Sequence, residues 1–336
     1  MDDPLWTERH APTLSELPQP DVRRYLEGAA DEPINLVLHG PAGVGKTAAV
    51  RALARDSHDS IDDLVIINVA DFFGMTKKQL SEDPRFSSFI TPKRRRESSK
   101  AALINHVLKE SAAYPPVSGS YRTILLDNAE AIREDFQQAL RRVMERHHEA
   151  TQFAITTRQP SALISPITSR CFPIPVRSPT TAETVSVLER IVEREGVETD
   201  PDGLEFVAGY ADGDLREAIL SAQTVVAKEG EITMQNAYEV LGELGPDERV
   251  TEMLAAAEAG EFTDARSTLD DLLVDEGYDG GEVLEDLLEV GRKRYEGDRL
   301  VELHRRAGEA DFDLARGTSD RIHLSHLLAD LGANGP

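Results

Sequence analysis

The sequence predicts an α/β domain, built on a parallel sheet with helices on both faces, followed by a wholly helical carboxyl-terminal half. Short apolar runs alternate with helical patterns as far as about residue 178, and this alternation is typical of a parallel sheet. Beyond that point the strand signal stops and only helical periodicity remains. A glycine-rich loop separates the first apolar run from the helix that follows it. In such sheets ligands bind beyond the carboxyl ends of the strands.

The elements of the α/β domain follow from the apolar runs and the residues that interrupt them. The runs have the length of a strand and are rich in β-branched residues. Residues 72–98 are polar and show little periodicity, so we expect an inserted loop or a short helical excursion there. We predict strands at residues 34–39, 64–69, 121–127 and 152–157, and helices at residues 21–29, 48–54, 99–112 and 134–147.

The helical half divides into two parts. Residues 180–243 have the pattern of three or four helices, and residues 247–334 that of four or five more with strongly acidic faces. Proline and glycine interrupt the periodicity near Ser178 and again at Leu244-Gly245-Pro246. We therefore expect three domains, at residues 1–178, 179–245 and 246–336.

The stretch from Gly40 to Thr47 has the spacing G-x-x-x-x-G-K-T between a predicted strand and a predicted helix. Glycines let successive backbone N–H groups turn toward one centre, and the following helix directs its positive dipole end to the same place. Lys46 then reaches the β and γ phosphates, and Thr47 can coordinate Mg²⁺. The pattern predicts that a nucleoside triphosphate is bound by Gly40, Pro41, Ala42, Gly43, Val44, Gly45, Lys46 and Thr47.

Asp127 ends the third predicted strand, about 80 residues after Lys46. A carboxylate at the end of a buried strand beside such a loop can hold Mg²⁺ through water. We expect Thr47 and Asp127 to form the magnesium site together, with Mg²⁺ arriving bound to the nucleotide.

The chain carries a formal charge of −24, from 61 acidic residues against 37 lysines and arginines. This balance argues against a generic nucleic-acid binder. Either the partner is basic or uncharged, or the surface is adapted to a very salty cytosol. The second reading is favoured because lysines are far fewer than arginines and acidic residues occur in every segment. In strong salt, overall charge says little about DNA binding, and only local patches are informative.

Neither a membrane span nor a signal peptide is expected, since no apolar run approaches about 18 residues and the amino terminus is acidic. We therefore expect a cytoplasmic protein without a membrane partner. The single cysteine, Cys171, excludes an internal disulfide and a cysteine-rich metal site, and it is best explained as a buried small residue. The pair His147-His148 is best explained as a solvated helix end.

Several further motifs occur in a fixed order along nearly the whole chain. Together with the glycine-rich loop, they make the sequence similar to the small subunits of replication factor C, the archaeal and eukaryotic clamp loader of the AAA+ class. The motifs are Trp6-x-Glu8 with Pro12-Thr13-Leu14, Asn68-Val69-Ala70-Asp71, Gln137-Gln138-Ala139-Leu140-Arg141-Arg142-x-Met144-Glu145, Pro166-Ile167-x-Ser169-Arg170-Cys171, Gly213-Asp214-x-Arg216, and a tail with Asp311-Phe312-x-Leu314, Gly317, Ile322-x-Leu324 and Leu327-Leu328-Ala329.

The resemblance implies an AAA+ P-loop module, a helical lid and a helical collar that joins subunits into a pentameric arc. The partners would be a large subunit and another small subunit of the loader. Such loaders use ATP to open a ring-shaped sliding clamp and to place it on primer-template DNA. The cofactors implied are ATP and Mg²⁺.

The resemblance also implies roles for two arginines. Arg170 would act in trans as an arginine finger on the nucleotide of the next subunit, where it would stabilise charge that develops in phosphoryl transfer. Arg216 would sense the γ-phosphate in cis from the lid. The alternative for both is an ordinary surface ion pair.

The sequence departs from the family at three positions. Asn128 stands where the family has the glutamate that activates the attacking water, and an amide cannot take up a proton. Arg158 stands where the family has an asparagine that helps to place the same water, and Ala11 replaces an arginine. Glu130 could be considered as a substitute base, although its offset points the side chain elsewhere. We expect slow or absent hydrolysis at this subunit's own site.

Three functions remain open. The first is a clamp-loader subunit that binds ATP and supplies Arg170 to a hydrolysing neighbour. The second is a scaffold or regulatory subunit that does not hydrolyse ATP. Asn128 favours this function, because it replaces the glutamate that activates water. The third is another AAA+ remodeller, such as a helicase loader or a branch-migration motor, and the collar-like tail argues against it.

One dense positive patch, Lys93-Arg94-Arg95-Arg96, lies in the inserted segment. Family resemblance puts DNA contacts on the helices that line the central channel, and residues 98–110, with Lys100 and Lys109, match one of these. The patch could add phosphate contacts to that channel. A solvated charged loop is the alternative.

Overall fold

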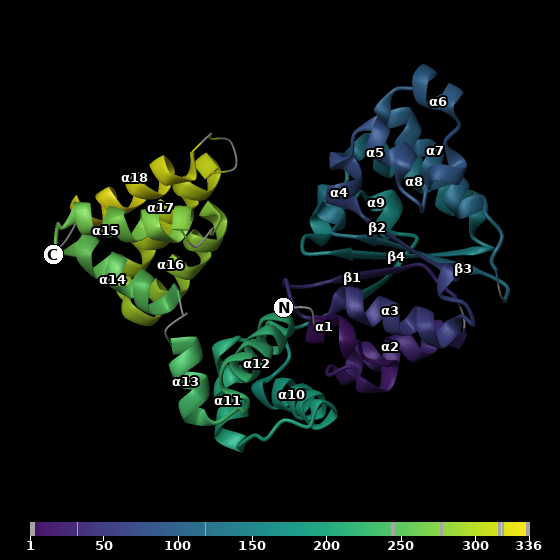
Figure 1. The fold of residues 1–336 in the computed structure, drawn as a ribbon. Helices are drawn as coiled ribbons and strands as arrows, with labels where there is room; N and C mark the ends of the chain where they lie inside the picture. The colour runs from purple at the N-terminus through teal and green to yellow at the C-terminus, as the bar shows by residue number, and fades with distance from the viewer. Residues whose placement is uncertain are drawn as a thin grey trace. The chain divides into compact units, whose positions relative to one another are not determined.

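The computed structural model describes residues 4–31, 33–117, 119–242, 246–275, 278–314, 317 and 319–333. The chain forms two compact units, Met1–Val240 and Leu241–Pro336 (Figure 1). The division into three domains stays a prediction, and residues 244 and 245 of its second boundary lie outside the described residues. No described helix is both long enough and apolar enough to cross a bilayer.

The first unit contains a five-stranded parallel sheet in the order β2-β3-β4-β1-β5. The four predicted strands are present, and the first begins two residues later than expected. The fifth strand was not predicted, because Pro173 and Pro175 interrupt its pattern. Proline is tolerated there since β5 lies at the edge of the sheet. The strands are β1 (Leu36–His39), β2 (Leu64–Asn68), β3 (Arg122–Asp127), β4 (Thr151–Thr157) and β5 (Phe172–Pro175).

Helices cover both faces of this sheet, as predicted (Figure 1). Side chains alternate between the faces, so Leu125 and Ala154 pack in one core while Ile124 and Phe153 pack in the other. The first core is completed by η1 (Leu14–Glu16), α2 (Pro20–Asp31) and α3 (Lys46–Ser57), and the second by α7 (Lys100–Ala113) and α8 (Glu134–His147).

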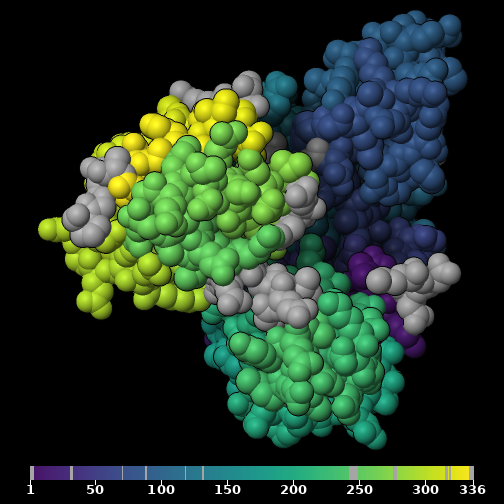
Figure 2. Space-filling view, turned by 60° about the vertical axis from the view of Figure 1, so that its left-hand side comes forward, coloured from purple at the N-terminus to yellow at the C-terminus, as the bar shows by residue number. Residues whose placement is uncertain are grey.

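The inserted segment is helical and packed, so the loop alternative is wrong and the helical one is confirmed. Phe72, Leu80 and Phe86 are almost completely buried in the core beside α7. Thr76 and Thr91 cap two of the helices through their hydroxyl groups. The segment comprises α4 (Val69–Gly74), α5 (Lys77–Glu82), η3 (Ser87–Phe89) and α6 (Pro92–Glu97); it forms the upper end of the first unit and is blue in Figure 2.

The remaining described residues are helical apart from short connections. Four helices end the first unit, and the second unit has its own apolar core built from five helices. These counts lie within the predicted ranges. The first unit ends with α10 (Thr181–Glu195), α11 (Pro201–Tyr210), α12 (Leu215–Glu229) and most of α13 (Met234–Gly242); the second contains α14 (Pro246–Glu258), α15 (Phe262–Asp270), a π-helical turn (Asp271–Asp275), α16 (Gly280–Arg294), α17 (Gly297–Leu314) and α18 (Asp320–Ala333).

The amino-terminal residues of the first unit pack against α10 and α12. The short helix α1 (Trp6–Arg9) contacts α12, and the backbone N–H of Trp6 donates to the Gln223 side chain. Glu16 pairs with Arg194 of α10, and hydrogen bonds from Thr13 and Arg194 keep the pKa of Glu16 below its ordinary value although burial opposes them. These contacts join α10 and α12 to the segment that precedes the sheet.

Candidate nucleotide-binding site

The glycine-rich loop joins β1 to α3 and contains three glycines with positive φ. The φ angles are 152° at Gly40, 63° at Gly43 and 93° at Gly45. A Cβ atom at Gly40 would lie 2.0 Å from the carbonyl oxygen of Val176, and one at Gly43 would overlap the Asp214 carboxylate. At Gly40 the obstacle is a backbone atom, so only glycine fits there; at Gly43 a side chain would have to displace Asp214 and would sit on a left-handed backbone. Pro41 and Ala42 are exposed at the tip, whereas Val44 is buried beneath it.

Lys46 lies in the first turn of α3 with only 8% of its surface exposed. Its ammonium group donates to the carbonyl oxygens of Gly40, at 2.8 Å, and Pro41. Burial lowers the pKa of Lys46, an effect that the Glu130 carboxylate partly opposes. The loop thus wraps its oxygen atoms around the cation, and phosphate oxygens can compete for the same group.

The structure brings Thr47 and Asp127 together. The Thr47 hydroxyl donates to Asp127 Oδ1 at 2.7 Å. A hydroxyl and a carboxylate at the carboxyl end of a parallel sheet are hard oxygen ligands, which Mg²⁺ prefers. The residues present therefore fit a magnesium ion that arrives with a nucleotide, and Thr47 and Asp127 would hold it, directly or through water.

Sequence reasoning missed Thr156 and Thr157, at the end of β4. The Thr156 hydroxyl donates to the same Asp127 oxygen that Thr47 contacts. Thr157 pairs in register with His39, and its carbonyl oxygen accepts from the backbone N–H of Gly40 at 3.3 Å. In the sequence these residues are only two hydroxyl side chains at the end of a predicted strand. Their partners could not be predicted, because the order of the strands in the sheet was not known.

Asn128 follows Asp127 directly and adopts a left-handed conformation, with φ at 57°. Asparagine tolerates this conformation better than most residues. Its side chain is exposed, and its backbone N–H donates to the Thr156 hydroxyl at 3.3 Å. The side chain next to the Asp127 carboxylate is therefore a neutral amide that cannot act as a general base.

Glu130 and Arg158 form an ion pair beside these residues. Arg158 Nε lies 3.1 Å from Glu130 Oε1, and the Thr157 hydroxyl and the Arg158 backbone N–H donate to Glu130 Oε2. Burial raises the pKa of Glu130, but hydrogen bonds from its own backbone, Arg158 and Thr157 outweigh burial and leave that pKa below its ordinary value. The carboxylate is thus directed at the end of β4 and stays ionised.

Arg170 follows α9 (Ser165–Thr168) and is one-third exposed. It donates to the Pro166 carbonyl oxygen at 2.8 Å and to Glu145 Oε1 at 2.5 Å. Glu145 also accepts from Arg141, and these arginines keep the pKa of Glu145 below its ordinary value. Among the described residues, Arg170 has no hydrogen bond to the glycine-rich loop. Sequence reasoning included Glu145 in a motif but did not predict that it holds Arg170.

Arg216 lies in the first turn of α12, with its side chain exposed. Asp214 caps this helix by accepting from the Glu217 backbone N–H at 2.9 Å, and the same carboxylate lies against Gly43. The start of α12 therefore contacts the glycine-rich loop, two residues from Arg216.

Cys171 is partly buried, and burial raises the pKa of its thiol to about 12. A thiol with this pKa is protonated at neutral pH, so Cys171 is no nucleophile. Within the described ranges, no group of three or more His, Cys, Asp or Glu side chains could hold a metal ion by itself.

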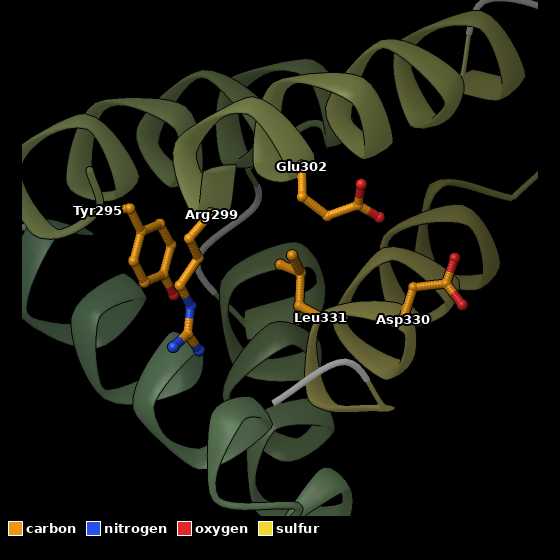
Figure 3. A pocket seen from close by; sticks show the side chains of 5 residues that line it. All are labelled: Tyr295, Arg299, Glu302, Asp330 and Leu331. Atoms are coloured by element: carbon orange, nitrogen blue, oxygen red, sulfur yellow. The ribbon is translucent and has the colours of Figure 1, made fainter. Parts of the chain in front are cut away.

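The second unit has a small pocket between its helices (Figure 3). The guanidinium carbon of Arg299 lies 5.0 Å from the centre of the Tyr295 ring. The volume is about 30 Å³, which holds no more than a few water molecules and is far too small for a nucleotide. Tyr295, Arg299, Glu302, Asp330 and Leu331 line this pocket.

Comparison with known proteins identifies both units. Residues 36–177 match the ATPase family associated with various cellular activities (AAA), and residues 245–330 match the replication factor C C-terminal domain. The chain is 31% identical to a replication factor C small subunit of Halobacterium salinarum, covering 98% of this chain and 96% of the relative. It is 32% identical to the corresponding subunit of Archaeoglobus fulgidus, covering 97% of each.

Among solved structures, the RuvB Holliday junction branch migration motor of Thermotoga maritima is similar, with a TM-score of 0.51. The match covers 77% of this chain and 88% of that protein at 18% identity, so it shows a shared fold and nothing further. The prediction of an AAA+ module followed by helical domains is confirmed, and the full-length similarity argues against a different AAA+ remodeller. The chain therefore belongs to the replication factor C small subunit family.

Proposed function

We propose that this chain is a cytoplasmic, ATP-binding small subunit of a clamp loader. It joins a large subunit and another small subunit in a pentameric arc that places a sliding clamp on primer-template DNA. The observation that carries this proposal is the similarity to replication factor C small subunits over nearly the whole chain. The three domains of this subunit are the AAA+ module at residues 1–178, the lid at 179–245 and the collar at 246–336.

The nucleotide is ATP, held by the loop from Gly40 to Thr47 with Mg²⁺ at Thr47 and Asp127. The buried Lys46 ammonium group and the 2.7 Å contact between Thr47 and Asp127 support this assignment. Arg216 senses the γ-phosphate in cis, which is supported by its position two residues after Asp214, the side chain that contacts Gly43.

This subunit hydrolyses its own ATP slowly or not at all. Asn128 cannot accept a proton from water, and Glu130 is already engaged by Thr157 and Arg158. The contribution to catalysis is Arg170, which acts in trans on the nucleotide of the next subunit. Asn128 also favours a second candidate, a scaffold or regulatory subunit in which ATP only stiffens the arc.

The test is a reconstituted loader in which only this subunit retains its phosphate-binding lysine. We expect this subunit to bind about one ATP per complex and to turn it over at no more than about 1% of the rate of an intact partner site, because a missing general base costs about 10²–10⁴ in rate. Binding is measured by filter retention of labelled ATP and turnover by phosphate release. Lys46→Ala in the same complex should abolish the binding.

Turnover at the rate of the partner sites would contradict the hydrolysis part of the proposal. A scaffold would instead be indicated if clamp loading continued unchanged with Lys46→Ala and with Arg170→Ala. The two candidate functions therefore differ in whether Lys46→Ala and Arg170→Ala change the rate of clamp loading.

We propose that helix α6 contacts DNA phosphates. Its four consecutive cations, from Lys93 to Arg96, are all exposed, and none has a carboxylate partner in the described ranges. The buried Phe86 and Leu80 anchor the segment that carries them. Lys109 on α7 is also exposed, whereas the Lys100 ammonium group donates to the Phe73 carbonyl oxygen and is less available.

Neutralising the four cations of α6 by glutamine should weaken DNA binding by the assembled loader and make it less sensitive to salt. If all four contact phosphates, the slope of log K against log salt should become shallower by about 3. In a control variant, four exposed arginines that pair with carboxylates are replaced by glutamine, so the net charge changes by the same amount as in the α6 variant. An unchanged slope, or an equal change in the control, would show that α6 is a solvated surface. The control residues are Arg24, Arg133, Arg299 and Arg305.

A further inference from the structure

Both terminal nitrogens of Arg170 are bound to oxygen atoms of this chain. Nη2 donates to Glu145 Oε1 at 2.5 Å, whereas Nη1 donates to the Pro166 carbonyl oxygen at 2.8 Å and to the Ser169 hydroxyl at 3.4 Å. A guanidinium group makes charge-assisted hydrogen bonds with carboxylate and phosphate oxygens alike, so the two acceptors compete for it. Arg170 can therefore present both terminal nitrogens to a phosphate only after it has left Glu145.

Glu145 can release Arg170 without being left unpaired. It lies in the last turn of α8, and Nε of Arg141, one turn earlier, donates to the same Oε1 atom at 3.0 Å. The side chains of Glu145 and Arg141 are both 41% exposed. An exposed ion pair contributes little to stability, and Arg141 still partners the carboxylate when Arg170 leaves. The contact between Glu145 and Arg170 is therefore reversible.

The main chain of Arg170 is held independently of Glu145. Its N–H donates to the Ile167 carbonyl oxygen at 3.0 Å, and its carbonyl oxygen accepts from Asn35 Nδ2 at 3.5 Å. The carbonyl oxygen of Asn35 also accepts from the Phe172 N–H at 2.7 Å. Because these bonds fix the backbone beside the sheet, Arg170 can exchange Glu145 for another acceptor by rotating its side chain alone.

We propose that Glu145 is an inhibitory ligand of Arg170, which keeps this arginine from the nucleotide of the neighbouring subunit until that phosphate is placed to compete. The inference rests on the trans role of Arg170 proposed above. Glu145 acts through Arg170 and is a positioning residue. Arg141 shares the Glu145 carboxylate with Arg170, so it weakens the inhibitory contact. The contact slows turnover most when the neighbouring phosphate is poorly placed and least in the catalytic arrangement of the subunits.

The test is ATP turnover by an assembled loader whose one hydrolysing site faces Arg170. Phosphate release is measured with and without clamp and primer-template DNA. Glu145→Gln should raise the rate without clamp and DNA about two- to fivefold, because an exposed pair worth up to about 1 kcal/mol shifts an equilibrium by no more than about fivefold. At saturating clamp and DNA the rate should stay within about twofold of the wild type, since the phosphate then outcompetes the carboxylate.

Asp135→Asn is the matched control. Asp135 lies on the same helix, is exposed, and pairs with Arg133 at 3.2 Å, so this change removes an equal charge and one exposed ion pair of α8. It should change neither rate. A rise in the rate without clamp and DNA equal to that of Glu145→Gln would show that the lost charge alone is responsible, and the inference would be overturned.

Arg141→Gln should shift the rate without clamp and DNA in the opposite direction. Without Arg141 the Glu145 carboxylate is left to Arg170 alone, so the inhibitory contact strengthens and the rate falls by up to about threefold. A merely structural role of this ion cluster predicts instead that Glu145→Gln and Arg141→Gln act in the same direction, because both remove the contact between Glu145 and Arg141. Changes in the same direction would therefore contradict the inference.

The double variant Glu145→Gln, Arg170→Ala should turn over ATP no faster than Arg170→Ala alone, because Glu145 acts only through Arg170. A faster rate in the double variant would mean that Glu145 acts by another route. Thermal unfolding shows whether each variant is folded, and Arg141→Gln tests the inhibitory contact by itself if Glu145→Gln is not.

The outcomes separate this inference from the proposed function. If Arg170→Ala lowers turnover at the neighbouring site but Glu145→Gln does not raise the rate without clamp and DNA, the inference is overturned while the trans role of Arg170 stands. If Arg170→Ala leaves turnover unchanged, both are overturned. A rise on Glu145→Gln that Arg170→Ala removes supports both.

Discussion

If Arg170 acts in trans as proposed, Arg170→Ala should lower ATP turnover about a thousandfold at the site of the neighbouring subunit. An arginine that stabilises charge on the transferring phosphoryl group contributes about 10³–10⁵ in rate. Because other sites of a loader would mask the loss, the assembly should contain only one hydrolysing site, the one that faces Arg170. Turnover is measured as DNA-stimulated and clamp-stimulated phosphate release. Arg170→Lys should recover little, since an ammonium group lacks the fork geometry of a guanidinium group.

Arg141→Ala is the matched control for this experiment. Arg141 donates to the same Glu145 oxygen as Arg170, at 3.0 Å, and has a comparable exposure. Its loss removes one arginine from Glu145 but leaves Arg170 in place, so turnover should stay within a few-fold of the wild type. Lys46→Ala, which disables this subunit's own site, should also lower turnover far less than Arg170→Ala. The opposite ranking would mean that this chain is an ordinary catalytic subunit.

Gly40→Ala should destabilise the first unit by about 3 kcal/mol or more and abolish ATP binding. The added Cβ would lie 2.0 Å from the Val176 carbonyl oxygen. Val176 cannot move aside easily, because its N–H donates to the His39 carbonyl oxygen at 2.8 Å in the extension of the sheet. The backbone of Gly40, with φ at 152°, is also unfavourable for alanine.

Gly28→Ala is the control for Gly40→Ala. Gly28 lies in α2, and a Cβ atom there would have no neighbour within 4 Å. This change should stabilise the unit by up to about 1 kcal/mol, because alanine loses less backbone entropy than glycine in a helix. Urea unfolding and ATP titration measure both variants. Wild-type stability and binding in Gly40→Ala would show that the close approach to Val176 does not exist.

The strands β1 to β4 could be predicted because each contains a short apolar run, as expected for a strand buried on both faces. The edge strand β5 could not, since its two prolines and its exposed Phe172 lack that pattern. The insertion was ambiguous for a related reason. Its buried Phe72, Leu80 and Phe86 are spaced irregularly, and only contact with α7 makes them a core.

The same distinction holds for the site. The loop from Gly40 to Thr47, with the carboxylate of Asp127, is a local pattern whose spacing carries its chemistry, so the sequence was enough to predict a triphosphate site. The partner of Arg158 lies 28 residues away at Glu130, and that of Arg170 lies 25 residues away at Glu145. Strand order and helix packing determine these partners. They could not be predicted, because an ion pair between residues that are distant in the chain leaves no periodic pattern in the sequence.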